Sequence, residues 1–140
     1  MNKISDKYKI KTGVVGVGSM GQNHARIYSE ISNLVAVSDS YSKQGKKIAE
    51  RFGVEFFENY REMFDKVEAI SIAVPTTLHL EVALAALRSG VNVLVEKPLA
   101  STAEESIKII DTSKEMKKVL SVGHIERHNP VVEYLKNSLI

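Results

Sequence analysis

The sequence predicts an α/β protein built on a doubly wound parallel sheet. Short apolar runs rich in β-branched residues alternate along the chain with longer segments in which apolar residues recur at helical spacing. Several short runs are apolar almost throughout, which is typical of strands covered by helices on both faces. Short connections between such units favour right-handed crossovers, and two halves of three strands predict the order 3-2-1-4-5-6. The predicted strands are Ile10–Val17, Leu34–Asp39, Val54–Phe57, Ala69–Val74, Val91–Glu96 and Val119–Gly123.

Helices are predicted between these strands, where start and stop signals agree with the apolar spacing. Gly53 and Gly90 stand just past two of the segments, in the position that a glycine commonly takes after a helix. Glu104 and Glu105 lie in the first turn of another segment, where acidic side chains interact favourably with the helix dipole. The predicted helices are Met20–Ile31, Ser42–Phe52, a short Tyr60–Phe64, Leu78–Ser89 and Thr102–Met116.

Length and composition limit the classes of function. The chain has 140 residues, of which 44% are hydrophobic and 26% charged, as in an ordinary globular domain. Its 19 basic residues are scattered and nearly balanced by 17 acidic ones, so no nucleic-acid partner is expected. No apolar run approaches the roughly 20 residues of a membrane span, and the first residues lack the apolar core of a signal peptide. We therefore expect a cytoplasmic protein, and the absence of cysteine fits that compartment.

A glycine-rich turn follows the first predicted strand and opens the first predicted helix. Gly16, Gly18 and Gly21 form the pattern G-x-G-x-x-G. The first glycine permits the tight turn, the second lets the backbone approach a pyrophosphate, and the third allows close packing of helix and strand. Ser19 and Met20 lie at the helix N-terminus, whose N–H groups carry partial positive charge. Alternatively, these glycines only shape a strand-to-helix turn.

Asp39 ends the second predicted strand, about 20 positions after the last glycine, where a dinucleotide-binding fold of the Rossmann type places its ribose-binding acid. A carboxylate accepts hydrogen bonds from ribose hydroxyls and repels a 2′-phosphate. Ser40 and Tyr41, which follow, provide no arginine for such a phosphate. NAD is therefore predicted as the cofactor and NADP is less favoured, although Lys43 lies near enough to weaken the preference. A helix cap for the next helix is the alternative role of Asp39.

Three further segments accompany the glycine turn, and together they resemble a known family. The segments read "PTTLH", "AALRSGVNVLVEKPLA" and "GHIERHNP". Over essentially the whole chain the arrangement is similar to the N-terminal half of the Gfo/Idh/MocA family of sugar and cyclitol dehydrogenases. The triplet Glu96-Lys97-Pro98 is the most specific element of this resemblance.

The resemblance implies a catalytic role for Lys97, beside the nicotinamide and the substrate hydroxyl. An ammonium group there would position that oxygen and stabilise negative charge on it. Glu96 would orient the ammonium group or bind ribose, and the Lys97–Pro98 bond is predicted to be cis. A solvated lysine and a surface acid at the strand end are the alternative interpretations.

The resemblance also places Val74, Pro75, Thr76 and His79 along the cofactor cleft. For His79 the alternative is a surface histidine at the start of a helix. His24, in the first predicted helix, either lines the glycine-rich turn or has a purely structural role.

The last segment resembles the crossing into a second domain. Arg127, Asn129 and Pro130 match the family's arginine-x-asparagine-proline pattern, while His128 stands where an aromatic residue is more usual. Arg127 and Asn129, with Lys97, are therefore predicted to contact substrate. The crossing is most similar to that of enzymes that oxidise nucleotide-linked N-acetyl sugars at C3. His124 and His128 lack an evident third ligand, so no metal site is predicted.

These observations predict two parts: a dinucleotide-binding domain over residues 1–123, and a crossing segment with a helix over 124–140. From the resemblance we expect the substrate domain that follows in the family to be absent from these 140 residues. The predicted function is that of the cofactor half of an NAD-dependent oxidoreductase acting on a CH–OH group of a sugar, sugar nucleotide or polyol. Alone, this half would bind NAD(H) without turnover. A nucleotide-binding module that senses redox state is the alternative, and a methyltransferase fits poorly because its ligand has no pyrophosphate.

The helix expected from Pro130 carries Val131, Val132 and Leu135 on one apolar face. Such a face requires a partner, because contiguous apolar side chains are otherwise exposed to water. We expect this helix to fold back on the sheet or to associate with a second copy of the chain in a homo-oligomer.

Overall fold

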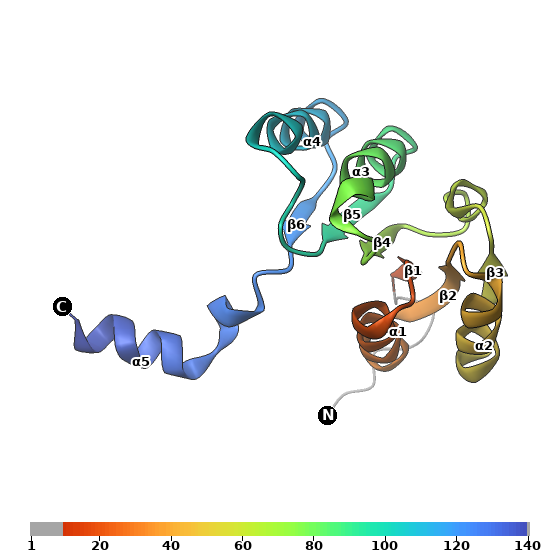
Figure 1. Cartoon of the computed structure of the whole chain (residues 1–140), viewed down its shortest axis with the longest axis horizontal. Helices are drawn as coiled ribbons and strands as arrows, with labels where there is room; N and C mark the ends of the chain where they lie inside the picture. Colours follow the sequence, from red (N-terminus) through yellow and green to blue (C-terminus); the bar gives the residue numbers. More distant parts are fainter. Residues whose placement is uncertain (1–9, 140) are drawn as a thin grey trace.

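The computed structural model describes residues 10–139, and a parallel sheet lies at its centre (Figure 1). The strand order is β3-β2-β1-β4-β5-β6, and every pairing is parallel. The predicted doubly wound topology is thereby confirmed. The strands are β1 (Lys11–Val15), β2 (Asn33–Ser38), β3 (Glu55–Phe57), β4 (Ala69–Ile72), β5 (Asn92–Val95) and β6 (Leu120–Val122).

Helices cover both faces of the sheet. The α-helices are α1 (Ser19–Ile31), α2 (Ser42–Phe52), α3 (His79–Arg88), α4 (Ala103–Glu115) and α5 (Pro130–Ser138), and the short 3₁₀ helices are η2 (Tyr60–Met63), η3 (Thr76–Leu78) and η4 (Ile125–His128). Figure 1 shows α1 and α2 on one face and α3 and α4 on the other. The segment expected as a short helix at Tyr60–Phe64 is a 3₁₀ turn. Most strands are shorter than predicted by one or two residues at one or both ends.

The hydrophobic core lies on both sides of the sheet because successive strand residues point to opposite faces. On β1, Val14 packs with the cluster under α1 and α2, which includes Ala25 and Ile48. Its neighbour Val15 packs with the larger cluster under α3 and α4, which includes Ile109. This two-sided burial explains why the central strands are apolar throughout.

Helix α5 extends away from the sheet (Figure 1). Asn129 caps it by accepting a hydrogen bond from the backbone N–H of Val131 at 3.0 Å, and Pro130 occupies its first turn. No residue of α5 is buried, and Val132 and Leu135 are exposed. The expectation that this helix folds back on the sheet is therefore wrong for the single chain, because η4 directs α5 outward. Association with a second copy stays a prediction.

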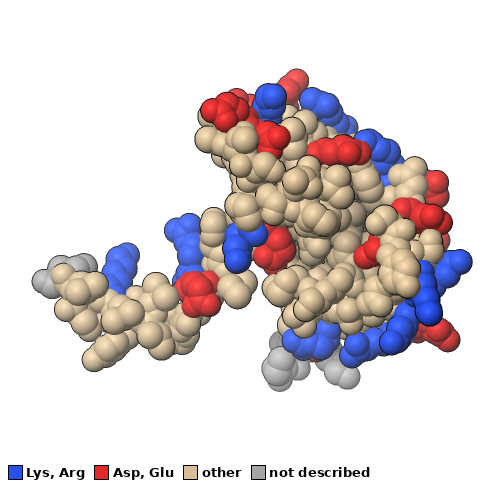
Figure 2. Space-filling model, viewed as in Figure 1, with Lys and Arg blue, Asp and Glu red and all other residues tan. Residues whose placement is uncertain are grey.

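Acidic and basic side chains are interspersed over the visible face of the molecule, as the balanced charge of the sequence predicts (Figure 2). Within residues 10–139, no helix is both long and apolar enough to cross a bilayer.

Candidate coenzyme site

The turn between β1 and α1 is packed tightly against the neighbouring strands. Gly16 has a φ of +84° and donates its N–H to Ser38 O at 2.8 Å. A Cβ on Gly16 would lie 2.8 Å from the backbone of Ala73, at the end of β4. A Cβ on Gly21 would lie 1.8 Å from the carbonyl oxygen of Gly16. The first and third glycines of the motif are therefore required by the fold itself.

The N-terminus of α1 offers backbone donors to an anion. The first helical hydrogen bond runs from Gln22 N to Gly18 O at 3.0 Å, so the N–H groups of Ser19, Met20 and Gly21 precede it. The N-cap residue Gly18 makes no side-chain cap, and the first turn contains no acidic residue. A Cβ on Gly18 would meet no atom within 4 Å. The middle glycine thus leaves space beside these donors, as a bound pyrophosphate requires.

Asp39 connects the glycine turn to the start of α2. Its Oδ2 accepts the N–H of Val17 at 2.8 Å, and its Oδ1 accepts the N–H of Tyr41 at 2.8 Å. The N-cap residue of α2 is Tyr41, so Asp39 supports this helix through the Tyr41 N–H without being its cap residue. Each carboxylate oxygen has a further lone pair with which it can accept a hydroxyl donor. The residue is half-buried at the edge where ligands of doubly wound sheets bind.

A crevice of about 720 Å³ runs along the carboxyl ends of β1, β2 and β4. Most of the predicted residues on this side of the sheet lie in its wall, whereas Thr76 does not, and Ser19 lines a separate hollow on the outer side of the turn. The predicted residues in the crevice wall are Gly16, Gly18, Met20, Asp39, Ser40, Val74 and Pro75.

Glu58, Asn59 and Tyr60 also line this crevice, and the sequence motifs did not identify them. They follow β3, and the carboxyl end of β3 lies beside that of β2. The hydroxyl of Tyr60 donates to Glu81 Oε1 at 2.8 Å and so connects η2 to α3. Burial, together with the neighbouring Glu81 carboxylate, raises the pKa of Tyr60 to about 12, so the hydroxyl is a donor at neutral pH. The predicted sheet order could have identified these residues, because it places the carboxyl end of β3 beside that of β2.

His79 is neither a surface histidine nor a residue of the crevice wall, which were the two positions considered from the sequence. It is only 1% exposed, and it does not line the crevice. Its Nδ1 is 2.9 Å from Pro98 O and its Nε2 is 2.9 Å from Val74 O. The ring thus connects the loop after β4 with the loop that carries Lys97. The expectation that His79 lines the cofactor cleft is therefore wrong, because the ring is buried between these two loops.

We expect His79→Leu to lower the free energy of unfolding by about 2 kcal/mol, because the carbonyl groups of Val74 and Pro98 would lose their contacts with the buried ring. His79→Gln keeps amide N–H donors and is expected to cost less than half as much. Urea unfolding of the three proteins measures the difference. Equal transition midpoints for the leucine variant and the wild type would show that the ring does not hold these loops.

Lys97 follows β5, and its peptide bond to Pro98 is cis, as predicted. The exposed side chain lines a hollow of about 400 Å³, together with Gly123, His124 and Arg127. Lys97 and Arg127 are therefore brought together, as expected for substrate contacts. Asn129 is not in this wall, because its side chain donates to Glu126 Oε2 at 2.8 Å and caps α5.

Glu96 turns its carboxylate toward α1. Its Oε1 is 2.7 Å from His24 Nε2, and its side chain is only 12% exposed, so it is not a surface acid. A third hollow of about 610 Å³ contains both residues. It shares Met20 with the large crevice, and Gly123 with the hollow at Lys97.

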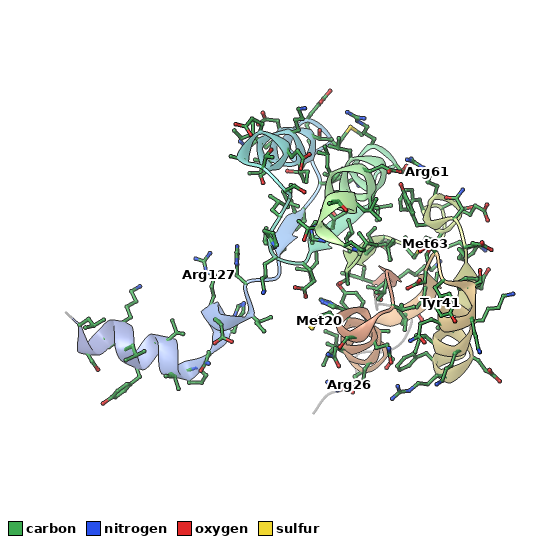
Figure 3. All side chains as sticks on the ribbon, in the orientation of Figure 1. Met20, Arg26, Tyr41, Arg61, Met63 and Arg127 are labelled. Atoms are coloured by element: carbon green, nitrogen blue, oxygen red, sulfur yellow. The ribbon has the colours of Figure 1, made fainter. Side chains whose placement is uncertain are left out.

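The three hollows thus adjoin one another along the sheet edge, from Asp39 across the glycine turn to Lys97, and we refer to them together as the groove. Figure 3 labels Met20 beside α1 and Arg127 on the segment that leads to α5. Figure 2 shows an acidic group beside basic side chains where the body meets the segment leading to α5. Within residues 10–139, no three histidine, aspartate or glutamate side chains come together as metal ligands would.

Comparison with known proteins agrees with this geometry. Residues 10–124 match the family model GFO_IDH_MocA, described as an oxidoreductase family with an NAD-binding Rossmann fold. The chain is 36% identical over 129 residues to UDP-N-acetylglucosamine 3-dehydrogenase of Acidithiobacillus ferrooxidans, covering 92% of this chain and 41% of the relative. It is 37% identical over 131 residues to an inositol 2-dehydrogenase of Rubrobacter xylanophilus, covering 89% of this chain and 38% of the relative.

Solved structures show the same similarity. That of UDP-N-acetylglucosamine 3-dehydrogenase from A. ferrooxidans matches with a TM-score of 0.89 at 35% identity, covering 93% of this chain and 43% of that one. The chain thus spans about two-fifths of the length of the relatives it matches. The chain belongs to the Gfo/Idh/MocA oxidoreductase family and contains its NAD-binding Rossmann domain.

Proposed function

We propose that this chain is the coenzyme-binding part of an NAD-dependent dehydrogenase that transfers hydride between a CH–OH group and nicotinamide. The succession of hollows from Asp39 to Lys97 supports this most strongly, because it puts an acid suited to ribose binding and an ammonium group on either side of a turn suited to phosphate binding. The named relatives are dehydrogenases of a sugar nucleotide and of inositol, which supports a sugar, sugar nucleotide or polyol as substrate.

The residues of the groove fit a dinucleotide. The N–H groups at the start of α1 would hold the pyrophosphate, and Asp39 would accept the hydroxyls of the adenosine ribose. The bound coenzyme supplies the hydride acceptor. The open space at Gly18 is the observation that allows a phosphate to reach the turn.

Lys97 is proposed as the catalytic residue of this chain. Its ammonium group would donate a hydrogen bond to the reacting oxygen and stabilise negative charge on it while the neighbouring carbon loses hydride. Arg127 lies across the same hollow and would contact substrate beside it, and Asn129 would hold the start of α5 near this position.

The substrate hollow is open to solvent in this chain, and the relatives are more than twice as long. We therefore propose that residues 1–123 form the coenzyme domain and that residues 124–140 lead to a second domain that closes over the substrate. On this proposal, residues 1–140 bind NAD(H) and turn over little or no substrate by themselves.

We expect the chain to bind NADH at least tenfold more tightly than NADPH, because a 2′-phosphate would lie against the Asp39 carboxylate. Asp39→Ala is expected to weaken NADH binding by about tenfold, through loss of a charged hydrogen-bond acceptor, and to remove the preference. Fluorescence titration with each coenzyme measures both effects.

Asp39→Asn is the matched variant for this experiment, because it keeps a hydrogen-bond acceptor at the same position and removes the charge. Thermal unfolding of each Asp39 variant separates loss of binding from loss of the hydrogen bonds to Val17 and Tyr41. A preference of the wild type for NADPH would overturn the proposed choice of coenzyme.

A further inference from the structure

His24 is fixed at both ring nitrogens between a buried strand and the Glu96 carboxylate. Its Nδ1 lies 3.0 Å from the Oγ of Ser71, which is fully buried on β4. The Oγ of Ser71 also lies 2.7 Å from the hydroxyl of Tyr28. At the other nitrogen, Nε2 donates to Glu96 Oε1 at 2.7 Å, because an ionised carboxylate only accepts. The side chain of His24 is 16% exposed, so little water competes for these contacts.

This contact fixes which oxygen of Glu96 remains available. With Oε1 bound to His24, Oε2 lies 3.3 Å from the backbone N of Lys97. A Cβ on Gly123 would lie 3.0 Å from Oε2, so the absence of a side chain at the end of β6 gives the carboxylate its room. The carboxylate thus lies between α1 and β6 in the part of the groove between Met20 and Lys97.

A dinucleotide contains two riboses, one on each side of its pyrophosphate. If Asp39 accepts the first, the second falls beyond the glycine turn, in the hollow that contains Glu96. We propose that His24 is a positioning residue, which holds the Glu96 carboxylate so that Oε2 accepts a hydroxyl of the nicotinamide ribose. This inference rests on the proposed function, because it requires the coenzyme to lie along the groove.

Calorimetric titration of the chain with NADH and with ADP tests the inference, because ADP has the adenosine and both phosphates but no nicotinamide half. We expect His24→Leu to weaken NADH binding by about tenfold and to change ADP binding by less than twofold. In His24→Gln the side-chain amide can donate to Glu96 in place of Nε2, and we expect it to restore most of the affinity for NADH.

Two controls separate positioning from support of the fold. Glu96→Ala is expected to weaken NADH binding as much as His24→Leu does. The double variant, with both substitutions, is expected to bind NADH no more weakly than Glu96→Ala alone, because His24 acts through Glu96. Circular dichroism of each variant would check that it is folded.

Each outcome decides a different point. If His24→Leu lost affinity for NADH and for ADP equally, His24 would support the glycine turn and not the Glu96 carboxylate. If its affinity for NADH were unchanged, His24 would not position the carboxylate at all. Either result would overturn the inference and leave the proposed function intact. Additive losses in the double variant would overturn it as well. A wild-type chain that binds neither ligand would contradict the proposed function and this inference with it.

Discussion

Gly21→Ala is expected to lower the melting temperature by about 10 °C and to abolish NADH binding. An alanine Cβ at this position would lie 1.8 Å from the carbonyl oxygen of Gly16 and 3.5 Å from Cγ1 of Val14. The oxygen belongs to the backbone of a turn that is itself packed on β4, so helix α1 would have to move away from the sheet. Overpacking of this kind costs about 3 kcal/mol, which corresponds to that temperature change in a domain of this size.

Scanning calorimetry and NADH titration of the same preparation measure the two effects of Gly21→Ala. The N–H donors that precede the first helical bond would move with α1, so affinity and stability should fall together. A variant that melts within about 2 °C of the wild type would contradict the packing assigned to this turn.

Gly18→Ala is expected to have the opposite combination of effects: only a small loss of stability and at least a 100-fold loss of NADH affinity. Gly18 has a φ of −68° and a ψ of −157° in the extended region, and an added Cβ would meet no atom of the protein within 4 Å, so an alanine costs only about 0.5 kcal/mol as a poorer N-cap residue. In the proposed complex, however, the pyrophosphate occupies that space and must approach the backbone closely. The methyl group would therefore displace the ligand and leave the fold unchanged.

Comparison of the two glycine variants separates binding from folding. The melting temperature of Gly18→Ala should lie within about 2 °C of the wild type, so that its binding defect cannot come from unfolding. If Gly18→Ala binds NADH as the wild type does, the phosphates do not lie at this turn.

The elements and the glycine turn could be predicted from the sequence because local chemistry determines them. Apolar runs such as Val35–Val37 identify strands that are covered on both faces, with Ala36 in one core cluster and Val37 in the other, and the doubly wound pattern of two three-strand halves then predicts the sheet order. That order brings the ends of β1, β2 and β4 to one edge, so Gly16 and Asp39 meet without any further information.

Contacts between distant side chains could not be predicted in this way. His24 and Glu96 are 72 residues apart, and His79 reaches Pro98 across 19 residues. Each pair depends on the rotation of a helix above the sheet, which a periodic pattern does not specify. For α5, the spacing of apolar residues predicts a helix with an apolar face, but it does not specify which surface packs against that face.

A crystal structure of the chain with NADH is the most direct test of the coenzyme site. We expect the pyrophosphate at the N–H groups of Ser19–Gly21, the adenosine ribose on Asp39, and the nicotinamide half toward Glu96 and Lys97. An empty groove at saturating NADH, or a coenzyme bound in the reverse direction, would contradict the account.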